Sequence, residues 1–218
     1  MPGTAVFDSG AGNLNFNTGV ENLPDQPQAL TGEQIPPDDG FGTSGNNTFN
    51  TPSLVEAADT GPFFHNNAIE TSEGAVSFFN GTAFNNSPAG LFLQQATGSA
   101  INLDGTQVVA VAAFLRVINA LENIRQSIEL LEPVAQKTRL GAAQAERTLD
   151  RTARETEDGI MVLAGAGLHP GAIMHLEKTL ALTQRAENRI SSKALRRRFA
   201  RQAIDQLQKA RDELVEPQ

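Results

Sequence analysis

The stretch Leu103 to Leu131, LDGTQVVAVAAFLRVINALENIRQSIELL, carries a long helical pattern. Its apolar residues recur at steps of three and four, which is the spacing of one face of an α-helix. Asp104 with Gln107 three residues later is a capping-box pattern, so we expect the helix to begin there. The apolar stripe consists of Phe114, Ile118, Leu121, Ile124, Ile128 and Leu131.

Three more helices are expected after this one. Pro133 permits a break or kink in the first helix after Glu132, because proline restricts the residue before it and lacks a backbone donor. Short connections between helices imply antiparallel neighbours, so residues 106–218 are interpreted as a helical bundle or hairpin array. The further helices are expected over residues 134–163, 171–187 and 193–215, the last with Ser191 or Ser192 as its cap.

The first hundred residues have a different composition. They contain ten acidic residues and no Lys or Arg, so the rest of the chain holds all 17 basic residues. This acidic part cannot be a nucleic-acid surface, because phosphate binding needs cations. Residues 1–60 are rich in Gly, Asn, Pro and Thr and predict irregular loop. Two short helices are expected next, one capped by Thr71 and one opened by Ser87 and Pro88.

Cysteine, tyrosine and tryptophan are absent from the chain. The lack of cysteine excludes disulfides, thiolate metal ligands and any cofactor attached through a thioether bond. The sequence has no run of 18 apolar residues, so we expect no membrane span. The first residues, MPGTAVFDSG, lack the basic and apolar regions of a signal peptide.

The run from Phe49 to Asn80, FNTPSLVEAADTGPFFHNNAIETSEGAVSFFN, resembles the C-terminal haem-domain signature of bacterial di-haem cytochrome c peroxidases and their MauG-like relatives. That signature reads roughly F-x-T-P-[ST]-L-R-N-x-x-x-T-x-P-[YF]-x-H-[DN]-G. Neighbouring blocks extend the resemblance over roughly residues 14–122, whereas residues 134–218 show none. The matching residues of the signature are Phe49, Thr51, Pro52, Leu54, Thr60, Pro62, Phe63 and His65.

The resemblance implies a periplasmic redox protein with two c-type haems and an electron-donor protein as its partner. One haem of such proteins reduces peroxide or forms a high-valent iron, and the other relays electrons. By resemblance, His65, Phe64 and Phe79 lie in the vicinity of a haem, and Phe79 occupies the position of the second iron ligand.

Several residues that this chemistry needs are replaced. The C-x-x-C-H motif that attaches a c-type haem is absent, so the chain cannot hold haem covalently. Phe79 offers no lone pair, and Val55 replaces an arginine suited to a haem propionate. Asn67 replaces a glycine, which is a milder change because Asn also tolerates a left-handed backbone. Two interpretations stay open: a fragment of a longer protein that carries the motif before Met1, or a relative that has given up haem.

Other residues with metal-binding or anion-binding chemistry form less specific patterns. Residues 169–175, HPGAIMH, contain side chains that could ligate iron or copper, but Met174 is expected on a core face. The acidic turn at residues 38–40, DDG, could contribute oxygens to a calcium site. A basic cluster on the last helix is interpreted as a solvated face that pairs with acids, with an anionic partner as the alternative. It consists of Arg196, Arg197, Arg198 and Arg201.

The sequence therefore predicts a mainly α chain. A loop-rich, partial cytochrome c-like domain is expected over residues 1–105, and long helices over 106–218, where 106–132 closes the cytochrome c-like part and 134–218 is an extension. We expect a peroxidase-like redox function, with no catalytic residue assigned and enzymatic activity left open. The alternative is a haem-free structural or partner-binding helical protein. If the chain is a fragment, the apolar face that begins with Phe114 and Ile118 is either exposed, which favours self-association, or covered by the C-terminal helices. No nucleic-acid partner is expected.

Overall fold

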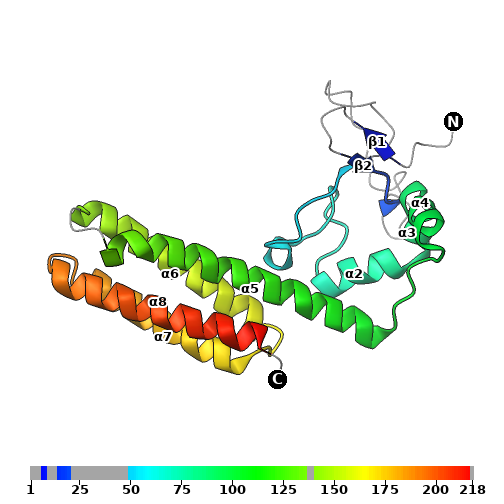
Figure 1. Ribbon diagram of the computed structural model, residues 1–218. Helices are drawn as coiled ribbons and strands as arrows, with labels where there is room; N and C mark the ends of the chain where they lie inside the picture. Colours follow the sequence, from blue (N-terminus) through cyan, green and yellow to red (C-terminus); the bar gives the residue numbers. More distant parts are fainter. Residues whose placement is uncertain (1–5, 9–13, 21–48, 137–139, 217–218) are drawn as a thin grey trace. The chain divides into compact units, whose positions relative to one another are not determined.

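The computed structural model describes residues 6–8, 14–20, 49–136 and 140–216 (Figure 1). The described part is mainly helical, as predicted, with a small antiparallel sheet of strand order β1-β2-β3. The strands are β1 (Val6–Asp8), β2 (Leu14–Phe16) and β3 (Phe49–Asn50). The helices are the 3₁₀ turn η2 (Ala57–Asp59), α2 (Ser72–Asn80), α3 (Thr82–Asn85), α4 (Pro88–Thr97), α5 (Gly105–Gln136), α6 (Ala142–Ala164), α7 (Pro170–Glu187) and α8 (Lys193–Val215).

The chain divides into two compact units, and the border between them falls within α5 instead of at residue 105. The loop-rich unit takes its described residues from 1–53 and 60–112. The four-helix unit comprises residues 54–59 together with 113–218. Residues 54–59 therefore belong with the long helices, although they lie within the stretch that resembles the peroxidase signature.

Three helices begin at the caps expected from the sequence. The Thr71 side chain accepts a hydrogen bond of 3.1 Å from a backbone N–H in the first turn of α2. Ser87 does the same for α4, also at 3.1 Å. At the start of α5, Asp104 and Gln107 exchange two hydrogen bonds of 2.9 Å between their side chains and each other's backbone N–H. Each cap provides a partner for a donor that a helix start leaves unpaired.

The predicted break at Pro133 is wrong, and so is the predicted start of the next helix at residue 134. Helix α5 continues through Pro133 to Gln136, and α6 begins at Ala142. A proline inside a helix costs about 3 kcal/mol. Leu131 and Val134, on either side of it, are completely buried. Burying a side chain of this size stabilises the fold by about 1.5–3 kcal/mol, so together these two residues outweigh the cost of the proline.

The loop-rich unit has a small core formed by Val20, Phe78, Phe84 and Ala89. Two asparagines fix the chain that leads from α4 into α5. Asn85 donates to the Ile101 carbonyl at 2.9 Å and accepts from the Ile101 N–H at 3.1 Å, and Asn80 exchanges a similar pair of bonds with Leu103. Gly90 permits the close contact between α3 and α4, because a Cβ there would lie 2.1 Å from the Phe84 carbonyl oxygen.

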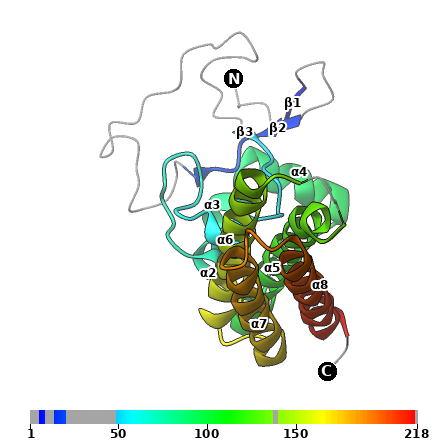
Figure 2. The ribbon, with the colours of Figure 1, turned by 90° about the vertical axis from the view of Figure 1, so that its left-hand side faces the viewer.

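The four-helix unit shares one core among α5, α6, α7 and α8, and Figure 2 looks along these helices. Helices α7 and α8 are consecutive and pack side by side. Many of the completely buried positions are alanines, which let helices approach closely, because the distance between helix axes depends on the side chains at the contact. These alanines are Ala120, Ala145, Ala172, Ala186, Ala200, Ala203 and Ala210.

The predicted stripe of α5 is only partly a core face. Ile124 and Leu131 are buried in the four-helix core, and Leu121 and Ile128 pack against it. Phe114, at the start of the stripe, is 61 % exposed. The spacing of the apolar residues therefore predicted the buried face of α5 correctly only for the second half of the stripe, which other helices cover.

The prediction that the arginines of α8 form a solvated face is wrong for two of them. Arg196 is only 2 % exposed and donates to the carbonyls of Ile190, at 2.9 Å, and Leu140, at 3.1 Å. Arg197 donates to the Ala135 carbonyl at the end of α5, at 3.2 Å. Carbonyls beyond a helix end have no helical partner. The two side chains therefore link α8 to three neighbouring segments, which are the end of α5, the end of α7 and the start of α6.

Arg196→Met should destabilise the four-helix unit by about 2 kcal/mol, because two carbonyls lose their donor and burying an unpaired carbonyl costs about 1–3 kcal/mol. Urea unfolding followed by circular dichroism at 222 nm measures this loss. Arg198→Met is the matched control on an exposed position of α8 and should change the stability by less than about 0.5 kcal/mol. Equal stability of the two variants would contradict a structural role for Arg196.

Candidate functional site

The loop around His65 is a tight turn. The Phe63 N–H donates to the Ile69 carbonyl at 2.6 Å, and these two residues form an antiparallel bridge. Between them, Phe64 and Asn67 adopt left-handed backbone conformations, with φ of 67° and 55°. Asn67 thus takes the conformation expected where the family signature has glycine. Phe64 is the strained position, because a bulky residue rarely adopts positive φ unless its surroundings hold it there.

His65 lies on the outside of this turn and is exposed. Its ring stacks on that of Phe49, with 3.9 Å between ring centroids and 11° between ring planes. Phe49 belongs to β3, so the stacking joins the sheet to the turn. The first and last residues matched to the family signature are therefore in contact.

Phe64 points into a cluster of four phenylalanines, which we call the Phe cluster. The Phe64 ring lies 4.7 Å from that of Phe78 and 5.9 Å from that of Phe79. Phe79 lies 4.9 Å from Phe84, between ring centroids. These separations and their tilted or edge-on geometries are the ones that aromatic pairs prefer. The cluster holds the His65 turn against α2 and α3, and its contact with the Phe64 ring offsets the backbone strain.

The residues present do not fit a covalently held haem. Phe79, at the position expected for the second iron ligand, packs its ring among other phenylalanine rings and has no lone pair. The chain has no cysteine for a thioether, and its first hundred residues have no cation for a propionate. Val55, in place of the family's arginine, is an exposed residue of the four-helix unit. Of the three residues expected near a haem, only Phe64 and Phe79 contact one another.

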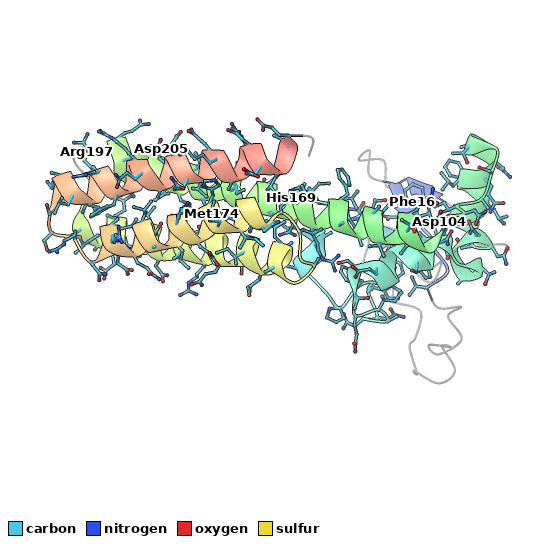
Figure 3. The ribbon with its side chains drawn as sticks, turned by 90° about the horizontal axis from the view of Figure 1, so that it is seen from below. Phe16, Asp104, His169, Met174, Arg197 and Asp205 are labelled. Carbon is cyan, nitrogen blue, oxygen red and sulfur yellow. The ribbon has the colours of Figure 1, made fainter. Side chains whose placement is uncertain are left out.

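The histidines of residues 169–175 do not form a common ligand set. His169 Nδ1 donates to the Glu213 carbonyl at 3.2 Å, and His175 Nδ1 donates to Gln206 Oε1 at 2.8 Å. Met174 is 44 % exposed, so the prediction that it lies on a core face is wrong. Figure 3 shows His169 at the start of α7 and Met174 one turn further along. Both histidines serve to hold α7 against α8.

No group of three or more His, Cys, Asp or Glu side chains suited to a metal ion occurs within residues 6–8, 14–20, 49–136 and 140–216. The acidic turn at residues 38–40, considered above for calcium, lies outside these residues. A membrane helix was also not expected, yet α5 contains an 18-residue stretch apolar enough to cross a membrane, and one third of that stretch is buried in the fold. The second half of α5 contributes Ile124 and Leu131 to the four-helix core.

A polar seam on α5 holds residues 54–59. The Asn119 side chain is completely buried, and its Nδ2 donates to Asp59 at 3.2 Å and to Asn123 at 3.1 Å. Gln126 donates to Glu56 at 2.7 Å. The sequence carried a signal for this seam, since Asn119, Asn123 and Ser127 recur every four residues on one face of α5. Nothing in the sequence indicated which residues would bind to it.

The same region carries excess negative charge. The pKa of the Asp158 carboxyl is raised, first by burial and then by the neighbouring charges of Asp59, Glu155 and Glu157. A raised carboxyl pKa means that the charged form is less favourable in the folded protein than in the unfolded chain. The contribution of Asp158 to stability therefore falls as the pH rises through its folded pKa.

Truncating the Phe cluster should destabilise the loop-rich unit. Phe78 is buried, and Phe78→Ala should cost about 3–5 kcal/mol, as for other buried aromatic residues. Hydrogen exchange measured by mass spectrometry over residues 61–100 follows this unit separately from the four-helix unit. Phe92→Ala, at a position that is 48 % exposed, is the control and should leave the exchange almost unchanged. Similar exchange in both variants would argue against the cluster as the core of the turn.

Asp158→Asn should raise the free energy of unfolding at pH 7, because the amide carries no charge to repel the neighbouring acids. The difference from the original chain should vanish as the pH falls below the ordinary carboxyl pKa of 3.8, where both side chains are neutral. Urea unfolding at a series of pH values measures it. Asp205→Asn, exposed on α8, is the control. A gain that persists unchanged at low pH would point to packing instead of charge.

Comparison with known proteins does not assign the chain to a family. No protein-family model, no curated protein and no solved structure matches it. The candidate site is therefore interpreted from its own residues.

Proposed function

We propose that the chain is part of a redox protein of the di-haem cytochrome c peroxidase kind, and that it does not attach haem by itself. The observation that supports the proposal is the stacking of Phe49 on His65. The two ends of the signature form one structural element, in which Phe64 and Asn67 have the special backbone conformations that its turn requires. A chance match of single residues would not be expected to fold in this way.

The proposed role of this chain is to supply the outer turn and one apolar wall of a cytochrome c-like domain. His65 lies on the turn, and Phe64 and Phe79 lie in the wall. The cysteines that attach haem have to come from outside these 218 residues, which contain none. Peroxide reduction or electron transfer, a periplasmic location and an electron-donor protein belong to the proposal through the family resemblance. The proposal includes no membrane span, with α5 as a core helix, and no nucleic-acid partner.

The second candidate is a haem-free helical protein that binds a partner. The Phe cluster favours it, because four phenylalanine rings satisfy one another there without any cofactor. Most of the described structure is the four-helix unit, which lies largely outside the stretch that resembles the peroxidases. In this candidate the turn of His65 is a structural remnant, and the long helices carry the function.

The native gene product separates the two candidates. A purification tag added at the C-terminal end of the chromosomal gene allows the product to be isolated from its own cells. Intact-mass measurement and a haem stain of the denaturing gel then show whether haem is bound covalently. We expect haem either on a tagged polypeptide heavier than 23.2 kDa or on a c-type cytochrome that stays bound to it. That product should also oxidise a reduced cytochrome when peroxide is added.

A tagged product with the mass of the 218-residue chain, without haem and without a bound cytochrome, would overturn the redox proposal. The second candidate would then stand. The isolated 218-residue chain serves as the matched control, since it should give no c-type pyridine haemochrome spectrum under any conditions of expression.

A further inference from the structure

One end of the four-helix unit is strongly basic, and we call it the basic end. It consists of the last turn of α7, the connection to α8 and the first turns of α8. Residues 185–201 contain a single acid, Glu187. Against it stand the cations Arg185, Arg189, Lys193, Arg196, Arg197, Arg198 and Arg201.

Five of these cations are available at the surface. Arg196 and Arg197 donate to backbone carbonyls inside the unit. The other five are exposed, and none forms an ion pair with another residue in the described part of the chain. Ion pairs within the described part of the chain therefore do not neutralise these five cations.

The opposite end of the same unit is acidic, and we call it the acidic end. It is formed by the last turns of α6, the last turn of α8 and residues 54–59. Its cations are few, and two of them, Arg151 and Arg211, already pair with Glu155 and Asp212. Its acids are Glu56, Asp59, Glu155, Glu157, Asp158, Asp212, Glu213 and Glu216. The repulsion felt by Asp158 agrees with this excess of negative charge.

The two ends are too far apart to neutralise each other within one copy. Arg197 and His169 mark them in Figure 3, at the starts of the antiparallel helices α8 and α7. The 18 residues of α7 span about 27 Å at 1.5 Å per residue. That is more than three Debye lengths at physiological ionic strength, where the Debye length is about 8 Å. Within the four-helix unit, the two ends therefore do not neutralise each other.

We propose that the basic end of one copy of this chain binds the acidic end of a second copy. The two surfaces have opposite charge, and α8 contributes its first turns to one and its last turn to the other. A nucleic acid fits less well, because it is negative along its whole length and the chain has a net charge of −8. Two different surfaces at opposite ends make a head-to-tail contact, which does not close on itself and produces linear chains. The inference does not depend on the proposed function.

Charge reversal at each end tests the proposal through sedimentation velocity of the full 218-residue chain. The original chain should form a ladder of oligomers at about 20 mM salt and dissociate at about 0.5 M salt, because salt screens surface charges. Arg198→Glu with Arg201→Glu reverses two charges of the basic end, and Glu157→Lys with Glu216→Lys reverses two charges of the acidic end. Each double variant alone should be monomeric, with association at least about tenfold weaker.

A mixture of the two double variants is the decisive measurement. The basic end of one variant and the acidic end of the other are intact, so the mixture should give dimers and no larger species. Circular dichroism spectra equal to that of the original chain exclude misfolding. A monomeric original chain at low salt, or a monomeric mixture, would overturn the proposal. So would oligomers that the charge reversals leave unchanged, or low-salt binding to a short DNA duplex that the original chain prefers over itself.

Discussion

The four-helix unit depends on close contact between helices that carry small side chains on their inner faces. Ala145 and Ala172, on α6 and α7, are completely buried, and so are Ala200 and Ala203 on α8. Small residues allow short distances between helix axes, so a few leucines are enough to fill the core. Three of the four buried threonines fit this packing, because Thr152, Thr156 and Thr179 donate hydrogen bonds to carbonyls of their own helices, as Thr156 does to the Thr152 carbonyl at 2.8 Å. The helix ends also leave polar backbone groups without a helical partner.

The burial of Arg196 follows from the need of these helix ends for hydrogen-bond partners. Its guanidinium joins carbonyls on either side of the core, beyond α7 and before α6. A run of three arginines at the start of a helix is normally a solvated feature, and the sequence offered no sign that one of them would be buried. The distinction depends on which residue of the run faces inward, and that is fixed by the register of α8 against α7. Burial of a cation is tolerable there because carbonyls accept its hydrogen bonds.

Features determined by neighbouring residues could be predicted, and features determined by distant ones could not. The starts of α2, α4 and α5 depend on caps within four residues, and the sequence located all three. The continuation of α5 through Pro133 depends on burial of Leu131 and Val134 against other helices, which no local pattern records. Met174 fails for the same reason, because its exposure is set by which face of α7 meets α6 and α8. In the candidate site, the sequence indicated that Asn67 tolerates the left-handed backbone that it adopts. The contact of Phe79 with Phe84 required the fold of α2 on α3.

The acidic end illustrates how hydrogen bonding and charge can be separated. Asn119 and Gln126 donate to the carboxylates of Asp59 and Glu56, so these oxygens have partners. An amide satisfies a carboxylate without neutralising it, and the negative charge of residues 54–59 is therefore added to that of Asp158 and its neighbours. A lysine at either amide position would have cancelled this charge within the unit. The use of amides keeps residues 54–59 attached to α5 while leaving the surface potential negative. Only a proton or a cationic group from outside the unit can reduce it.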